Sequence, residues 1–369
     1  MAEWRRGIAW LVFGLAACSR DARPLARPAG PAAETLPALE LDHRSVTTET
    51  TVPLLEETLQ AAPNGDVAFA ATEDDRDLYT LVDSGGHHHI RMIPVGQGPA
   101  EMLRPVALAI SDSDLTLSDL ATSRVTAVRR NGTIAASHIV VPTLAVAMDA
   151  GPGELVTVIS DARGPQPILL HLATGATREL TERPDSFLAT AFRGSDGSGS
   201  PLVPVLGRWN GGFIIADGWR YRLALYDWQG VRQRILARDI PRPVLTAARV
   251  DTAFRHGQSR VNARHDPSAA DRERAEIAAQ PQPYFPHTRA LGLDGQGRIW
   301  VFGIDADSGF ADVFSATHFL GRIALSCPAF ASAAAVAGHW LVLGCGSTDA
   351  TSDTGTELKV FRIVDPPSH

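Results

Sequence analysis

Residues 212–230 read GFIIADGWRYRLALYDWQG, and this stretch indicates the fold more clearly than any other part of the chain. An apolar run at 212–217 is followed by a short polar loop and by a second apolar run at 221–227. Gln229 and Gly230 then supply turn residues. Short apolar runs bounded by Gly and Asp are typical of β-strands joined by tight turns. The stretch therefore predicts neighbouring antiparallel strands.

The same pattern recurs along the chain, with further copies starting near residues 65, 114, 153, 297 and 339. Most of the intervals lie near the roughly 40 to 50 residues of one propeller blade. Six such units closed into a ring leave few strand edges exposed, whereas an open stack leaves many. We therefore predict an all-β fold, a six-bladed β-propeller over residues 45–369. The stretch 45–59, before the first copy, is expected to complete the last blade.

Composition narrows the range of functions. The chain has 369 residues, a formal net charge of -7, 32 Gly, 25 Pro and 3 Cys. An acidic chain has no surplus of cations to neutralise phosphates, so we expect no nucleic-acid partner. Three cysteines are too few to staple a chain of this length, so a hydrophobic core must hold it together.

The N-terminal segment has the features of a secretion signal. A short basic start with Arg5 and Arg6 precedes an apolar run at 7–17, which is too short to span a bilayer. The run ends in Leu-Ala-Ala-Cys18, which resembles a bacterial lipobox. The resemblance implies that residues 1–18 are a lipoprotein signal peptide with lipobox and that Cys18 is lipidated. Residues 19–44, rich in Pro and Ala, are predicted to form an extended tether.

A second resemblance concerns residues 95–105, VGQGPAEMLRP, and residues 124–128, RVTAV, with the turn Asn131-Gly132. Together they resemble the NHL-type repeat, in which a Gly-x-Gly-Pro-Gly-Glu-Phe stretch and a Pro precede a blade that ends in Arg-Val-x-Val and a Gly. The whole chain resembles secreted bacterial six-bladed propeller lipoproteins with NHL or TolB-like repeats. That resemblance implies a place in the bacterial cell envelope. Because Ser19 rather than Asp follows Cys18, it implies the periplasmic face of the outer membrane.

In a propeller, the loops between second and third strands and those between consecutive blades gather at one end, where ligands usually bind. We expect this end to carry residues 72–77, 96–104, 119–123, 217–220 and 304–309. A long insertion between blades 4 and 5, about residues 238–286, includes a helix predicted at 267–277. It is interpreted either as a lid over the channel or as edge packing.

Aromatic and cationic residues near this insertion are the candidate ligand-binding residues. Such a rim suits an anionic or sugar-like ligand, although arginines also gather on solvated loops in a chain with one lysine. The candidates are Trp209, Trp219, Arg220, Tyr221, Arg255 and Arg260.

Metal and disulfide chemistry have weaker signals. The acidic loop at 73–77 offers carboxylates for Ca²⁺ but lacks the spacing of a dedicated calcium loop. Of the three consecutive histidines only His87 and His89 point to one face of a strand, and no third ligand is assigned. We therefore predict no cofactor and no metal site, with a divalent cation such as Ca²⁺ kept as the alternative. Cys327 and Cys345 are either a disulfide pair or free thiols.

No Gly-x-Ser-x-Gly, Walker, His-Glu-x-x-His or Cys-x-x-Cys motif is found, so we predict no catalytic residues. The leading hypothesis is a membrane-tethered extracytoplasmic scaffold that binds an envelope protein, a peptide or a carbohydrate-like ligand. The first alternative is a metal-dependent lactonase- or lyase-like enzyme with a site in the central channel. The second is a structural envelope component. Candidate groups for the enzyme are Asp119, Asp217, Asp294 and His287.

Overall fold

The computed structural model describes residues 36–42, 46–47, 59–73, 76–92, 96–98, 101–103, 105–110, 114–119, 122–129, 133–139, 148–150, 154–161, 164–171, 173–179, 205–217, 220–247, 250–251, 267–279, 284, 291–305, 308–325, 331–345 and 357–366. Within these ranges antiparallel β-strands dominate, and the helix α3 spans Pro267–Ala279. The predicted all-β class is confirmed.

Four sheets contain four strands each, and each is built from strands that follow one another in the chain. The first consists of β3 (Gln60–Ala61), β4 (Val67–Glu73), β5 (Arg76–Val82) and β6 (His88–Met92). The second consists of β7 (Pro105–Ile110), β8 (Asp114–Asp119), β9 (Arg124–Arg129) and β10 (Ile134–Ile139). The third consists of β11 (Met148–Ala150), β12 (Glu154–Asp161), β13 (Gly164–His171) and β14 (Thr177–Glu179). The fourth consists of β15 (Val205–Trp209), β16 (Gly212–Asp217), β17 (Arg222–Asp227) and β18 (Arg232–Ala237).

The remaining strands form one sheet of 9 strands. Its first half contains β19 (Leu291–Asp294), β20 (Ile299–Asp305), β21 (Ser308–Phe314) and β22 (Phe319–Ala324). Its second half contains β23 (Ala331–Gly338), β24 (Trp340–Cys345) and β25 (Glu357–Val364), with β1 (Ala38–Leu41) and β2 (Val46–Thr47) paired to β25. The halves are joined by a parallel pairing of β19 with β23.

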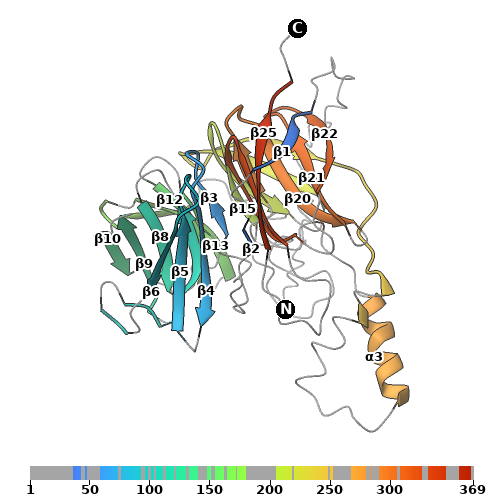
Figure 1. The fold of residues 1–369 in the computed structure, drawn as a ribbon, viewed down its shortest axis with the longest axis horizontal. Helices are drawn as coiled ribbons and strands as arrows, with labels where there is room; N and C mark the ends of the chain where they lie inside the picture. Colours follow the sequence, from blue (N-terminus) through green and yellow to red (C-terminus); the bar gives the residue numbers. More distant parts are fainter. Residues whose placement is uncertain are drawn as a thin grey trace, which may run out of the picture.

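The first strand of each unit lies at the centre of the molecule. We call β3, β7, β11, β15, β19 and β23 the inner strands. Each contacts the next in this order, and β23 contacts β3, so the inner strands close a ring. Figure 1 shows β3 and β15 near the middle, with β10 and β22 towards the outside. The sheets therefore radiate from a common hub.

The hydrophobic core lies between successive sheets. One cluster joins Val156 and Leu169 of the third sheet to Phe213 and Tyr226 of the fourth, whose rings stack with centroids 5.2 Å apart. Another joins the first sheet to the last through residues such as Phe69 and Val342. Because each central strand is covered on both faces, runs such as 213–216 are buried throughout instead of alternating. This packing holds the two ends of the chain in one ring.

The ring is closed by a strand from the N-terminal side. β1 pairs antiparallel with β25 from Ala38 opposite Val364 to Leu41 opposite Phe361. The sequence analysis assigns residues 19–44 to a tether and expects the closing strand within 45–59, so the tether prediction is wrong for 38–41. The shorter β2, within 45–59, also pairs with β25. Leu36 reinforces the closure, because its side chain fills the space that a Cβ at Gly321 of β22 would occupy.

The chain between β18 and β19 contains the helix α3, which overlaps residues 267–277. Figure 1 shows α3 to one side of the sheets. An ion pair of 2.8 Å between the Arg274 Nε and the Asp251 Oδ1 links it to an earlier part of the same segment. In the described part of the chain, no helix has the length and apolar character needed to cross a membrane.

Candidate functional site

Two glycines allow the inner strands to approach each other closely. A Cβ on Gly207 of β15 would lie 2.6 Å from the Cβ of Leu291 on β19. A Cβ on Gly292 of β19 would lie 2.7 Å from the Cβ of Val336 on β23. Both distances are too short for packed carbon atoms. The inner strands β15, β19 and β23 can therefore pack this closely only because Gly207 and Gly292 have no side chain.

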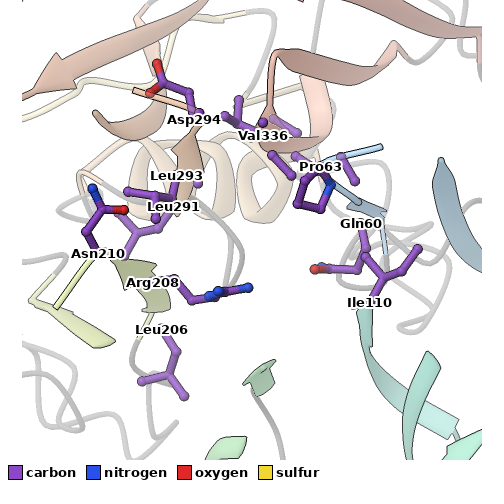
Figure 2. A pocket seen from close by; sticks show the side chains of 17 residues that line it. Gln60, Pro63, Ile110, Leu206, Arg208, Asn210, Leu291, Leu293, Asp294 and Val336 are labelled. Carbon is purple, nitrogen blue, oxygen red and sulfur yellow. The ribbon is translucent and has the colours of Figure 1, made fainter. Parts of the chain in front are cut away.

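A cavity of about 260 Å³ lies inside this ring. Its walls come from β3, β7, β15, β19 and β23, so it is built from strands that are far apart in the sequence. Figure 2 shows apolar side chains such as Ile110, Leu206 and Leu291 around the cavity, and polar and apolar atoms contribute about equally to its exposed lining. The polar side chains among the lining residues are Gln60, Arg208, Asn210 and Asp294. A concave pocket that combines apolar side chains with a few convergent polar groups is a common form of a small-molecule site.

Arg208 is the cation of this cavity. Its Nε is buried without a hydrogen-bond partner. No ion pair to Arg208 is found within the described ranges. In Figure 2 the guanidinium group extends across the cavity towards Gln60. A buried donor without a partner is costly, so the arrangement favours an acceptor that binds in the cavity.

Gln60 faces Arg208 with its acceptor oxygen. The Gln60 Nε2 donates a hydrogen bond of 2.7 Å to the carbonyl oxygen of Leu59. This bond occupies one side of the amide group and leaves the Oε1 on the side of the cavity, as Figure 2 shows. The cavity thus offers a charged donor on one wall and a neutral acceptor on the facing wall.

Asp294 does not neutralise Arg208, because its carboxylate has other partners. The Oδ1 accepts hydrogen bonds from the backbone N–H groups of Gln296 and Arg298, at 3.0 and 2.9 Å. The Oδ2 accepts from the Arg298 Nε at 2.6 Å and from the Trp300 Nε1 at 2.8 Å. These bonds hold the turn between β19 and β20, where Gly297 has a positive φ of 77°. Asp294 is therefore a structural carboxylate.

No family model and no curated protein matches the chain. A solved structure of a member of the duf4221 family from Bacteroides vulgatus is similar, with a TM-score of 0.51 and 10% identity over 90% of this chain and 100% of that one. A protein from Bacteroides fragilis has a TM-score of 0.51 and 7% identity over 90% and 96% of the two chains. A catalytically inactive virginiamycin B lyase from Staphylococcus aureus, solved with quinupristin, has a TM-score of 0.47 and 10% identity over 89% and 100%.

These neighbours, together with the ring of radiating sheets, decide the fold. The chain is a β-propeller. At identities of 7 to 10% the likeness extends to the fold alone.

The cavity lies at the end of the propeller opposite to the predicted ligand face. Pro63, Asn210 and Gly295, which line it, lie in turns between an inner strand and the second strand of its unit, and Gly338 ends β23 just before such a turn. These turns contact one another: the Gly295 N–H donates to the Gly338 carbonyl oxygen at 2.6 Å. The sequence analysis places the ligand at the loops between second and third strands, which are at the other end of these strands.

The predicted aromatic and cationic rim is not assembled as expected. Trp209 ends β15 and its Nε1 donates to the Tyr226 carbonyl oxygen at 2.8 Å, so the indole is used in packing. Tyr221 lies at the far end of β16 from Trp209 and is only 1% exposed. Among the candidates with described side chains, only Arg220 is exposed. Trp219, Arg255 and Arg260 lie outside the described residues.

Tyr221 instead belongs to a buried polar group that we call the Asp312 cluster, made of Tyr221, Arg238, Asp312 and Arg322. The carboxylate of Asp312, on β21, is fully buried. It accepts hydrogen bonds from the Tyr221 hydroxyl and the Arg238 Nη1, both at 2.5 Å, and from the Arg322 Nε at 2.7 Å. Burial first, and then the Asp312 carboxylate, raise the pKa of the Tyr221 phenol well above its usual value. The cluster joins the fourth sheet to β21 and β22.

Aromatic rings extend the Asp312 cluster. The Arg238 guanidinium lies 3.8 Å from the centroid of the Phe319 ring. The edge of Tyr284 packs against Tyr221, and its hydroxyl donates to the Ile240 carbonyl oxygen at 2.6 Å. Both ends of the long segment between β18 and β19 are therefore fixed to the propeller near Tyr221. The wrong prediction for Tyr221 follows from this packing, because an aromatic in a turn looks exposed in sequence.

The candidate groups for an enzyme have other roles or are not described. The Asp119 carboxylate is 1% exposed and accepts hydrogen bonds from the Leu103 N–H at 3.0 Å and the Thr122 hydroxyl at 2.6 Å. Asp119 thus fastens a loop, as Asp294 fastens a turn. Asp217 lies in β16, its side chain is not described, and His287 lies outside the described residues.

No group of three or more His, Cys, Asp or Glu in the described ranges could hold a metal ion. The exposed His87 contacts Asp83, with 3.2 Å between the Nδ1 and the Oδ1, and His89 lies in β6. The acidic loop at 73–77 joins β4 to β5, and its residues 74 and 75 are outside the description.

The glycine-rich stretch that begins at Gly96 forms a compact loop. The Gly98 N–H donates to the Glu101 Oε2 at 2.8 Å, and a Cβ on Gly98 would lie 2.9 Å from that oxygen. Arg124 on β9 donates to the Gln97 carbonyl oxygen at 3.2 Å. Met102 is 2% exposed and enters the core between the first two sheets. The residues of the motif therefore serve to seat the loop.

Cys345, at the end of β24, is buried and disulfide-bonded. Cys327 and Cys18 lie outside the described residues. Cys345 pairs in register with Ala331, which is four positions after Cys327 in the chain.

Sequence reasoning missed Arg208 and Gln60 as site residues. The available signal was a charged residue at the fourth position of the apolar run VLGRW in an inner strand. A lone arginine in such a run is a departure from the apolar pattern expected of a strand at the hub.

Proposed function

We propose that the chain is a six-bladed β-propeller lipoprotein that acts as a ligand-binding scaffold without catalysis, and that its ligand occupies the hub cavity. The observation that carries the proposal is Arg208, a cation that lines the hub cavity and whose buried Nε has no hydrogen-bond partner. Among the predicted partners, a carbohydrate-like small molecule suits this cavity better than a protein, because the site is concave and small.

The number of blades is supported by the topology. The 9-stranded sheet is joined at its middle only by the two inner strands β19 and β23, through Leu293 opposite Ala337 and Asp294 opposite Gly338. Its halves, β19–β22 and β23–β25 with β1, each have the four-stranded form of the other sheets. Counted in this way, the inner strands belong to six blades.

The anchoring part of the proposal depends on the lipobox at Cys18. A lipid attached to Cys18 would anchor the propeller at the bacterial envelope, on the periplasmic face of the outer membrane. Metabolic labelling with an alkyne fatty acid should mark the unaltered chain, and the Cys18→Ala chain should stay unlabelled in the same cells. Equal labelling of both chains would contradict anchoring at Cys18.

Binding in the hub is tested by thermal unfolding of the full chain in detergent, with a panel of neutral, cationic and anionic small molecules. A ligand at about 100 times its Kd stabilises a protein by about 2.7 kcal/mol, which raises the Tm of a domain of this size by roughly 4 °C. At least one compound should raise the Tm of the unaltered chain and of Arg220→Met, an exposed control. The same compound should leave Arg208→Met unchanged. A panel without any such compound would contradict a ligand site in the hub.

A further inference from the structure

The hub cavity holds a positive charge that the described protein does not neutralise. Among the described lining residues, Asp294 is the one acidic side chain, and its two oxygens take four hydrogen bonds from the turn and from Arg298 and Trp300. Arg298 is in turn paired with Asp365, with 2.6 Å between the Nη2 and the Oδ1. The charge on Arg208 is therefore left for a ligand. A carboxylate matches the fork of a guanidinium group with two parallel hydrogen bonds.

Gln60, on the wall that faces Arg208, adds a requirement for a hydrogen-bond donor on the ligand. The Gln60 Oε1 can accept but not donate a hydrogen bond, and its Nε2 is already bonded to the Leu59 carbonyl oxygen. A ligand whose carboxylate meets Arg208 would therefore gain from a hydroxyl group that reaches Gln60. A plain fatty acid would leave this acceptor without a donor, which disfavours it.

The volume limits the size of the ligand. A cavity of about 260 Å³ lies just below the range of about 300 to 1,000 Å³ that is usual for the pockets of drug-sized ligands. This size suits an organic acid of three or four carbon atoms with its hydroxyl groups. Apolar side chains such as Ile110 and Leu206 line the cavity beside Arg208 and lower the local dielectric, which strengthens a charged contact.

We infer that the hub cavity selects small hydroxylated carboxylates, with the carboxylate on Arg208 and a hydroxyl group on the Gln60 Oε1. This inference rests on the proposed function, because it names the chemical class of the ligand for the same cavity. It involves no chemical step and requires no metal.

Three probes of similar size separate the two contacts on the unaltered protein. Threonate has a carboxylate and hydroxyl groups, threitol has only the hydroxyl groups, and butyrate has only the carboxylate. Isothermal titration calorimetry on the full chain in detergent should give a Kd for threonate at least tenfold lower than that for butyrate. Threitol should show no measurable binding.

Two variants then assign the contacts. Arg208→Met should weaken threonate binding at least tenfold, and Gln60→Leu should remove the preference for threonate over butyrate. Circular dichroism and the Tm show that each variant is folded, and Arg220→Met serves as the matched arginine control. If a variant does not fold, the affinities of the three probes for the unaltered chain still show whether the cavity requires both a carboxylate and a hydroxyl group.

The outcomes separate this inference from the proposed function. Equal binding of threitol and threonate, or binding of threonate that survives Arg208→Met, would overturn the selection of carboxylates but leave a hub ligand site intact. Binding of butyrate equal to threonate would overturn the role of Gln60. If threonate fails but a compound of the wider panel binds in an Arg208-dependent way, the named class is wrong and the scaffold proposal stands. If nothing binds, both are wrong.

Discussion

Asp312→Ala removes the carboxylate at the centre of the Asp312 cluster and leaves the donor groups of three side chains without their acceptor. Removing one partner of a buried ion pair typically lowers the free energy of unfolding by about 3 to 5 kcal/mol. Here the two arginine side chains are 19% and 34% exposed, so water can reach part of each guanidinium group and reduce the loss. The Tyr221 hydroxyl, which is buried, adds about 1 to 3 kcal/mol for an unsatisfied donor. We expect a total loss of about 3 to 5 kcal/mol.

The assay is urea unfolding of the full chain in detergent, followed by tryptophan fluorescence. Trp300 is a suitable reporter, because it is fully buried on β20 and pairs in register with Val313, next to Asp312. Asp251→Ala is the control, since it breaks an exposed ion pair with Arg274 and should change the free energy of unfolding by less than about 0.5 kcal/mol. A loss below about 1 kcal/mol for Asp312→Ala would refute the reasoning, because the cluster would then contribute no more than a surface pair.

Three further predictions concern single positions. Burial raises the pKa of the Tyr221 phenol above its unfolded value near 10, so the folded state binds this proton more tightly than the unfolded state does. The protonated phenol therefore stabilises the fold fully below about pH 10, and this contribution is lost as the pH rises further. In urea unfolding, Tyr221→Phe should flatten the fall in stability between pH 9 and about 11. Gly207→Ala puts a Cβ 2.6 Å from Leu291 and should lower stability by about 1 to 3 kcal/mol, whereas an unchanged Tm would mean that the inner strands can separate. Non-reducing peptide mapping should find Cys345 linked to Cys327, and Cys345→Ser should cost about 2 to 5 kcal/mol; a map that links Cys345 to Cys18 would contradict this pairing.

The repeat of strands was predictable from the sequence because it depends on local patterns. The runs at 212–217 and 221–227 correspond to β16 and β17, and Gln229 and Gly230 lie in the turn that follows. Gly230 has a positive φ of 81°, which explains why a glycine is found there. Apolar runs and turn glycines act over a few residues, so a single sequence contains the information for them.

The closing strand and the hub site were not predictable in the same way. Residues 38–41 have a weak strand pattern, with three of four side chains exposed or nearly so, and they form β1 only because β25 offers an unpaired edge. Arg208 and Gln60 are far apart in sequence and meet only after the ring has closed. The positions of such residues depend on long-range packing, which no local pattern contains.

The pairing of β1 with β25 gives the molecule a mechanical property. In the described part of the chain, a pull from the N-terminal side meets Leu36, which packs against Gly321 of β22, and then β1, which is held to β25 by the four residue pairs from Ala38 to Leu41. A force along the strand loads these pairs together in shear, while a force across it would open them one after another. Because β1 covers the outer edge of β25, detaching β1 would leave that part of β25 as a free β edge. The strand that completes the fold is therefore also the point at which tension on the N-terminal side would be felt.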